Sequence, residues 1–459
     1  MDKFFEFRKK HPIFLYKNYH ITENIDSIDI VYDFEIPELA EFHPSWSFVK
    51  PKNCSIKNDL TFERIAFSLG MVEAVSYWKS VCSPEMRVEC GELDTEQIKW
   101  WKKLYFMGLG EFFYINHIQT DMENFMNISC NGSFKNTVEK SNAPIGCLVP
   151  IGGGKDSALT IETLKNAGIK CKCYSINKRV SVRDTVLTAG LNESDLIYSR
   201  RNFDRSLIKL NEKGYLNGHT PFSAIVAFSA EITAYLNDLK YIVLSNEASA
   251  NETTVIDSDV NHQYSKSFEF ENDFHNYESR FLKTNIYYFS FLRPLSELQI
   301  AKMFAAHKKY LPVFRSCNLG SKVSPDIWCA ECPKCLFVSL ILSPFVTSQE
   351  LTDIFGKNLI DDEDMLDYFT KLIGKSEHKP FECVGSIDEV NLAVQMTIKK
   401  YLKEKTPIPL LLEKYMEMGL YSPDGIDEKA EEYMSKYNDV NLLPEKFELI
   451  LKEEMERIL

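Results

Sequence analysis

The spacing of apolar residues along this 459-residue chain changes several times, and each change predicts a different kind of element. Up to about residue 60, short apolar pieces such as IDIVYDFEIPEL alternate with Pro, Asn and Asp, which predicts strands and turns. Residues 62–82 and 95–116 carry apolar side chains at three- and four-residue spacing, which predicts two helices. The second helix begins with a polar turn around Thr95 and Gln97, typical of a capping box.

Strand and helix patterns alternate after a polar linker at residues 131–144. Apolar segments at 147–151, 170–177, 195–202 and 241–249 predict strands, and helical patterns follow the first strand and occupy residues 222–238. This alternation is typical of a parallel α/β sheet, and the chain beyond about residue 346 is predicted to be helical and acidic. We therefore expect an α/β protein with an N-terminal α+β domain (1–140), an α/β domain (141–345) and a helical C-terminal region (346–459).

Charge and composition exclude some classes of protein. The formal net charge of -13 argues against a nucleic-acid-binding surface, which is built mainly from Lys and Arg. No apolar run reaches membrane-spanning length, and the first residues lack the apolar core of a signal peptide. We therefore expect a cytoplasmic protein without nucleic-acid or membrane partners. In such a reducing compartment its 12 cysteines should serve as thiols, metal ligands or catalytic groups.

The most informative segment is a glycine-rich loop, IGGGKDS, between the first strand of the α/β region and its helix. Consecutive glycines let backbone N–H groups approach a polyphosphate, and the following helix turns its positive end towards the anion. A Walker A motif would need glycine at Val149 and Ser or Thr at Asp156, so this loop is a different phosphate site. The residues expected at the nucleotide are Gly152, Gly153, Gly154, Lys155, Asp156 and Ser157.

The loop resembles the S-G-G-x-D-S loop of the PP-loop pyrophosphatases, with Gly152 in place of the first serine. The resemblance implies a HUP-like nucleotide-binding domain that cleaves ATP to AMP and diphosphate. Because ligands collect at the carboxyl ends of parallel strands, Ser245, Asn246 and Glu247 are expected beside the loop. Asp156 and Glu247 are candidate Mg²⁺ ligands, since hard oxygen donors suit that ion.

Four cysteines form a second candidate site. The run IWCAECPKC and an upstream cysteine could place four thiolates around a tetrahedral Zn²⁺; an iron–sulfur cluster, or reduced cysteines at the start of a helix, are the alternatives. Some PP-loop synthases carry a similar cluster, with a shorter gap after the first cysteine. The residues concerned are Cys317, Cys329, Cys332 and Cys335.

Other residues suited to acid, base or anion chemistry lie in connecting segments. A glycine turn places His219 before a helix, and the segment SEHKPFECVGS holds His378 and Cys383. Arg200 and Arg201 end a predicted strand and could pair with a substrate phosphate or carboxylate, although surface arginines are common.

Several segments together resemble the bacterial UDP-N-acetylmuramoyl-L-alanyl-L-glutamate epimerase family. They are GGGKDSALTIETL, GYLNGHTPFSA, VLSNEASANE, YFSFLRPLSELQIAKMF, FRSCN with WCAECPKCLFV, and HKPFECVGS. The resemblance implies conversion of the terminal L-Glu of a UDP-sugar peptide to D-Glu, with ATP and Mg²⁺ as cofactors. It implies catalytic roles for Lys155 and for two proton-transferring groups, with Cys383, His378, His219 and Cys317 as candidates.

Two other functions remain open from the residues alone. A PP-loop synthase could adenylate a carbonyl or carboxylate and then add ammonia or sulfur, although no glutaminase motif is visible in the first 140 residues. A nucleotide-binding sensor without turnover would be a second alternative, which the combination of Lys155, Asp156 and Ser157 with acidic metal candidates disfavours.

Overall fold

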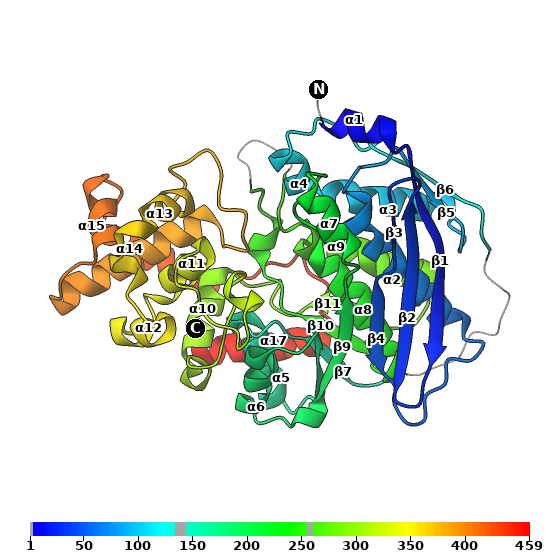
Figure 1. The fold of residues 1–459 in the computed structure, drawn as a ribbon. Coiled ribbons are helices and arrows are strands. Elements are labelled where there is room, and N and C mark those ends of the chain that lie inside the picture. The colour runs from blue at the N-terminus through cyan, green and yellow to red at the C-terminus, as the bar shows by residue number, and fades with distance from the viewer. Residues whose placement is uncertain (1–2, 134–143, 255–259) are drawn as a thin grey trace.

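A computed structural model describes residues 3–133, 144–254 and 260–459 of the chain. The expected domain boundary at residues 140 and 141 lies outside these residues. Figure 1 shows a large twisted sheet flanked by helices, with the N-terminal strands at one side of the molecule and a group of C-terminal helices at the other.

The described strands form one sheet of 11 members. Five come from the α/β region and lie parallel in the order β11-β10-β7-β8-β9. The N-terminal strands continue the same sheet, because β4 pairs antiparallel with β9. The strands are β1 (Ile13–Glu23), β2 (Ser27–Ile36), β3 (Ala40–Phe42), β4 (Ser45–Val49), β5 (Glu85–Val88), β6 (Asn127–Cys130), β7 (Cys147–Pro150), β8 (Cys171–Ile176), β9 (Leu196–Asn202), β10 (Tyr241–Leu244) and β11 (Tyr287–Ser290).

The order of the parallel strands creates a binding position. The chain runs from β7 outward through β8 and β9, and then crosses back to place β10 on the other side of β7. Connections leave the sheet in opposite directions at such a switch point and open a crevice at the carboxyl ends of the strands. The glycine-rich loop follows β7 directly and therefore lies in that crevice.

The sheet separates two hydrophobic cores, because alternate side chains of a strand point to opposite faces. On β7, Leu148 packs into the core with the N-terminal helices and Val149 into the core with the C-terminal helices. The first face is covered by α2 (Leu60–Trp78), α3 (Thr95–Gly108), α8 (Phe222–Leu236) and α9 (Phe268–Tyr277). The second is covered by α5 (Lys155–Asn166), α10 (Glu297–Ala305) and α17 (Glu445–Ile458).

The chain after residue 346 is helical, as its sequence predicts. No helix among the described residues is both long enough and apolar enough to cross a bilayer. The remaining α-helices are α1 (Lys3–Lys10), α4 (Gly110–Ile115), α6 (Val180–Thr188), α7 (Ser206–Glu212), α11 (Pro333–Leu342), α12 (Ser348–Phe355), α13 (Leu366–Leu372), α14 (Ile387–Glu404), α15 (Leu410–Glu417) and α16 (Ile426–Ser435).

The structure confirms a mixed α/β fold with a mostly parallel central sheet, and the four predicted strands of the α/β region are present as β7, β8, β9 and β10. One local prediction shifts by a residue. The capping box of α3 is formed by Asp94 and Gln97 rather than by Thr95, which is already the first helical residue.

Candidate active site

The glycine-rich loop joins β7 to α5 with each glycine in a different role. Gly153 has φ +84, and a Cβ there would lie 2.5 Å from the hydroxyl of Ser181, so only glycine fits. A Cβ on Gly152 would meet nothing within 4 Å, which leaves that side of the loop open to a ligand. Gly154 caps α5, so the helix presents its free N–H groups towards the same space.

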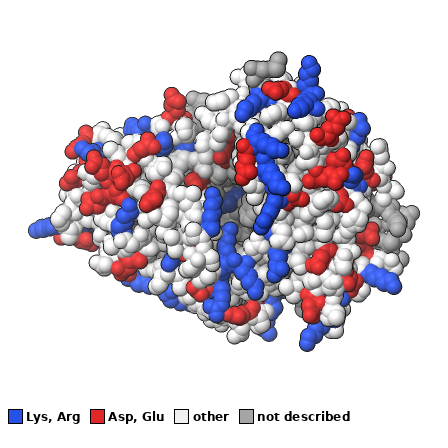
Figure 2. All heavy atoms as spheres, viewed as in Figure 1, with Lys and Arg blue, Asp and Glu red and all other residues white. Residues whose placement is uncertain are grey.

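A cavity of about 350 Å³ lies at the mouth of this loop. Figure 2 shows Lys and Arg side chains gathered around a hollow near the middle of the face drawn. Of the residues expected from the sequence, Gly152, Gly154, Asp156, Ser157, Ser245, Asn246, Cys317 and Cys383 line the cavity. Further lining residues that carry charge are Arg179, Lys266, Arg315, Asp326 and Lys334.

Lys155 lies at the centre of a buried charge cluster. Its side chain is 2% exposed, and its ammonium donates to the carboxylates of Asp156 and Glu297. Burial alone would lower the pKa of Lys155, but these two carboxylates raise it. Burial raises the pKa of Glu297 to about 8, and nearby Asp156 and Glu247 act in the same direction. With this pKa, Glu297 gains or loses its proton close to neutral pH.

The residues after β10 reach the same cavity. Ser245 and Asn246 line it, and the hydroxyl of Ser245 is buried and has no hydrogen-bond partner among the described residues. Asn246 is fixed by donating to the hydroxyl of Ser290 at 3.0 Å. A buried hydroxyl without a partner costs free energy, so Ser245 is available to a polar ligand in the cavity.

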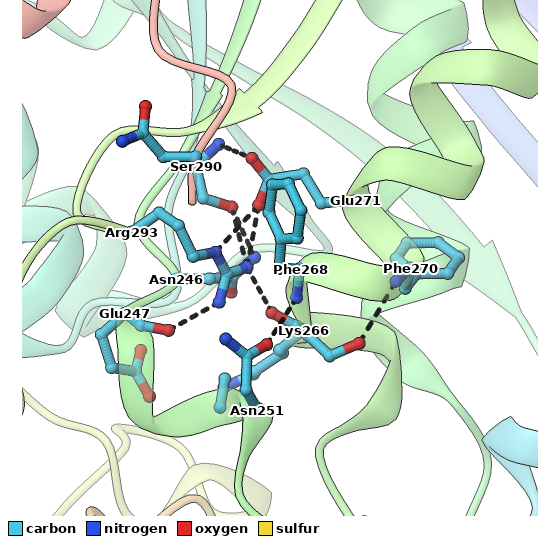
Figure 3. A network of polar contacts seen from close by, with 12 residues as sticks. Asn246, Glu247, Asn251, Lys266, Phe268, Phe270, Glu271, Ser290 and Arg293 are labelled. Carbon is cyan, nitrogen blue, oxygen red and sulfur yellow. Dashed lines mark hydrogen bonds and ion pairs between the residues drawn. The ribbon is translucent and has the colours of Figure 1, made fainter. Parts of the chain in front are cut away.

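Arg293 fixes the segments that carry Glu247 and Lys266 (Figure 3). Its guanidinium is 0% exposed and pairs with Glu271, with Nη2 at 2.8 Å from Oε2. The same group donates to the backbone carbonyl of Glu247 at 2.6 Å and to that of Lys266 at 2.5 Å. Both carbonyls lie in segments that border the cavity. The planar guanidinium of Arg293 therefore fixes the backbone from which the side chains of Glu247 and Lys266 project.

We expect Arg293→Met to lower the free energy of unfolding by about 3–5 kcal/mol, because Glu271 would be left buried without its cation. Urea unfolding followed by circular dichroism measures this. Arg183→Met is the matched control, since Arg183 and its partner Glu193 are exposed and should contribute less than about 1 kcal/mol. Equal stability of the two variants would contradict a structural role for Arg293.

Cys383 lies in the loop between α13 and α14 and is surrounded by cations. Lys266 donates to its sulfur at 3.1 Å, and the ammonium of Lys334 donates to its backbone carbonyl. Burial would raise the pKa of the Cys383 thiol, but Lys266, a hydrogen bond with His262, and Lys334 together lower it to about 6. At neutral pH this cysteine is therefore a thiolate facing the cavity.

The two histidines predicted as acid–base residues, His219 and His378, lie outside the cavity lining. His219 Nδ1 is 3.1 Å from the carboxylate of Glu111, which also accepts from Nδ1 of His262. Burial, the nearby His262 and Lys79 lower the pKa of His219 to about 3, so its ring is neutral. His378 stacks against Phe381 with ring centroids 5.6 Å apart, and its Nδ1 is buried without a partner among the described residues.

The sulfur atoms of the four cysteines Cys317, Cys329, Cys332 and Cys335 lie within 4.8 Å of one another. Neighbouring sulfurs are 3.5–3.7 Å apart. Four thiolates at about 2.3 Å around a tetrahedral zinc would be about 3.8 Å apart, so the cluster fits this ion. Cys317 is one of these four sulfurs. A thiolate bound to a metal cannot readily carry a proton as well, so Cys317 becomes a weaker candidate for proton transfer.

We expect purified protein to carry about one Zn²⁺ per chain in this cluster, and Cys332→Ser to lose the metal and lower the melting temperature by about 10 °C. Elemental analysis and thermal unfolding measure the two effects. Cys130→Ser, outside the cluster, should retain both the metal and the melting temperature. Metal-free wild-type protein, or iron with visible absorbance, would contradict zinc.

The hypothesis that Arg201 binds substrate is wrong, whereas that for Arg200, an exposed residue, stays a prediction. Arg201 does not face a ligand: its guanidinium is buried and forms two hydrogen bonds with Glu73 of α2, at 2.8 and 2.9 Å. The same carboxylate accepts from the indole of Trp46 at 3.1 Å. Arg201 therefore links β9 to α2, the helix that packs on the first face of the sheet.

Several charged residues of the site were not predicted from the sequence. They are Glu111, His262, Lys266, Glu297, Arg315 and Lys334. Of these, Glu297 stands in the first turn of a recognisable capping-box helix, where an acidic residue needs no further explanation. Lys334 stands between Cys332 and Cys335, and Arg315 stands two residues before Cys317, but the pattern there is that of the cysteines. Glu111, His262 and Lys266 lie in segments where no motif points to the cavity.

Comparisons with known proteins agree across most of the chain. Residues 6–291 match the sequence model of the MurL N-terminal domain, and residues 313–417 match that of the MurL C-terminal domain. No solved structure was found to match.

Curated relatives are similar over about three quarters of the chain. A protein of Xanthomonas oryzae pv. oryzae named UDP-N-acetyl-alpha-D-muramoyl-L-alanyl-L-glutamate epimerase is 34% identical, over 71% of this chain and 72% of its own length. A protein of the same name from a Micromonospora strain is 34% identical over 76% of this chain and 78% of its own length. A third, from Salinispora tropica, is 34% identical over 73% of each chain. With both domain matches in sequence order, the chain belongs to the MurL family.

Proposed function

We propose that this protein is an epimerase that converts the terminal L-Glu of UDP-N-acetylmuramoyl-L-alanyl-L-glutamate to D-Glu, coupled to cleavage of ATP to AMP and diphosphate. The observation that carries the proposal is that the glycine-rich loop and the thiolate of Cys383 border one cavity. The names of the curated relatives give the substrate class.

The nucleotide-binding part of the proposal rests on the loop and the sheet. The parallel order β11-β10-β7-β8-β9, with the loop directly after the central strand β7, supports placement among the PP-loop, HUP-like proteins. The open side of Gly152, the free N–H groups of α5 and the hydroxyl of Ser157 would receive phosphate oxygens. Ser245 offers a further hydroxyl.

Three acidic residues and one lysine would determine how the negative charge of the phosphates is neutralised. Asp156 and Glu247 both act on the pKa of Glu297, so the three acidic groups share one electrostatic environment. Asp156 and Glu247 provide the hard oxygen donors that fit Mg²⁺, which when bound would neutralise charge on the diphosphate leaving group. Lys155, which pairs with Asp156 and Glu297, would add positive charge close to the phosphate site.

The reaction itself explains why a nucleotide site and a base belong together. The α-proton of glutamate is hard to remove while the neighbouring carboxylate is ionised, because the carbanion would sit beside a negative charge. Adenylation removes that charge and turns the carbonyl into an electron sink. A base then takes the proton, an acid returns one to the opposite face, and hydrolysis of the acyl-adenylate leaves AMP.

We assign the first proton-transferring role to Cys383, which lines the cavity as a thiolate, because the other candidate in the lining, Cys317, belongs to the four-cysteine cluster. His219 and His378 remain candidates for the second role, although each would need to act from outside the cavity lining. We also propose that the protein works in the cytoplasm, where ATP and the nucleotide-linked substrate are available.

The proposal is tested by the stoichiometry of AMP and D-Glu. Purified protein with ATP, Mg²⁺ and the UDP-sugar dipeptide should form AMP, diphosphate and the D-Glu product in equal amounts, measured by chromatography and chiral analysis. AMP formation that continues without conversion of L-Glu would contradict the epimerase, and D-Glu formed without any ATP would contradict the coupling.

A further inference from the structure

Cys383, His262 and Glu111 form a cluster of side chains beside the cavity. Glu111 belongs to α4, His262 to the loop before residue 264, and Cys383 to the loop between α13 and α14. The carboxylate of Glu111 accepts from Nδ1 of His262, and the His262 ring lies close enough to the sulfur of Cys383 for each group to shift the pKa of the other. The three side chains therefore form a chain of thiol, imidazole and carboxylate.

Hydrogen bonds in the surrounding segments hold the three residues close to one another. His262 N donates to the hydroxyl of Thr254 at 3.0 Å, and Lys379 N donates to the backbone carbonyl of the same threonine at 3.2 Å. The side chain of Gln263 donates to the carbonyl of Val384 at 3.4 Å. Two loops far apart in sequence are thus tied together on both sides of Cys383, while the His262 ring itself is held by its hydrogen bond with Glu111.

Charge explains what the arrangement does. Burial alone would lower the pKa of His262, but Cys383 and Glu111 raise it to about 9, so the ring is an imidazolium at neutral pH. Cys383 also faces the ammonium of Lys266, with that of Lys334 and the carboxylate of Glu382 nearby. An imidazolium and two ammonium groups outweigh the burial of the sulfur and stabilise its ionised form.

We propose that Glu111 and His262 are positioning residues that hold Cys383 as the thiolate that exchanges the α-proton of the substrate, with Lys266 completing the cation shell. The inference rests on the proposed function. The substrate C–H bond breaks, its proton forms an S–H bond with Cys383, and its electron pair moves onto the activated carbonyl. His219 packs beside this chain, with ring centroids 4.6 Å from His262, and its neutral ring shares Glu111 without adding a second positive charge.

The test measures the thiolate without any substrate. Full-length protein is treated with iodoacetamide over a range of pH, and alkylation of Cys383 is followed by peptide mass spectrometry. For the wild type the rate should rise with a midpoint near pH 6, the pKa of Cys383. In His262→Gln and Glu111→Gln the midpoint should move up by about one unit or more, so the rate near pH 6 falls by about fivefold or more.

His307→Gln is the matched control, because His307 forms a comparable buried pair with Glu454, at 3.3 Å, on another part of the fold. Its Cys383 profile should match the wild type. Glu111→Asp, which keeps the carboxylate, should restore part of the shift seen in Glu111→Gln. Unshifted profiles in both His262→Gln and Glu111→Gln would overturn the inference.

The experiment separates this inference from the proposed function. If the alkylation profiles shift as expected but no epimerisation occurs, the positioning role stands and the function falls. If the protein epimerises the substrate while His262→Gln keeps the wild-type alkylation profile and the wild-type pH dependence of α-proton exchange, the function stands and the positioning role falls.

Discussion

Replacing Lys155 with methionine is expected to reduce substrate-dependent AMP formation by about 10²- to 10³-fold, the cost of removing one preorganised electrostatic group from a reacting centre. Methionine fills a similar volume but carries no charge, and Lys155 is a buried cation at the first residue of α5. Lys165→Met, at the other end of the same helix, should leave AMP formation unchanged.

Stability must be separated from catalysis in this variant. Without Lys155, the carboxylates of Asp156 and Glu297 lose their shared cation. The pKa of Glu297 is already raised from 4.5 to about 8, so its ionisation costs folding free energy as the pH rises through that interval. Lys155→Met should therefore be less destabilised at low pH than at high pH. The double variant Lys155→Met/Glu297→Gln should recover stability while AMP formation stays low; recovered AMP formation would contradict the role of Lys155.

Replacing Cys383 with serine is expected to separate the two halves of the reaction. A serine hydroxyl is not ionised near neutral pH and cannot replace a thiolate as a base, so exchange of the α-proton should fall by about 10²- to 10⁴-fold. The glycine-rich loop is untouched, so AMP formation should continue at a rate close to that of the wild type. Mass spectrometry of the substrate in heavy water and chromatography of AMP measure the two rates.

The control for this variant is Cys90→Ser, which changes a partly exposed cysteine of the N-terminal region and should keep both rates. Loss of AMP formation together with proton exchange in Cys383→Ser would show a role in nucleotide binding instead of proton transfer. Normal proton exchange would exclude Cys383 as the base.

The local parts of this site could be predicted from sequence because they depend on neighbouring residues. Strand β7, its loop and α5 follow each other within a short segment, and the period of apolar residues changes at each boundary. The cysteine cluster is likewise visible from spacing, since Cys329, Cys332 and Cys335 lie close in the chain.

The parts that depend on distant contacts could not be predicted in this way. Lys155 and Glu297 are separated by 142 residues, and Glu111 and His262 by 151. The antiparallel pairing of β4 with β9, which joins the N-terminal strands to the α/β sheet, has no local signal either. Arg201 illustrates the resulting error: its residue type suggested a ligand contact, whereas a distant glutamate on α2 takes its guanidinium.

The most direct measurement of the central claim is deuterium incorporation at the α-carbon of the terminal glutamate. Wild-type protein is incubated in heavy water with ATP, Mg²⁺ and UDP-N-acetylmuramoyl-L-alanyl-L-glutamate, and the product is analysed for chirality and isotope content. We predict D-Glu that carries deuterium at the α-carbon, formed together with AMP. AMP without deuterium would retain carboxylate activation but contradict epimerisation at this site, and the absence of both AMP and D-Glu would contradict the proposed function as a whole.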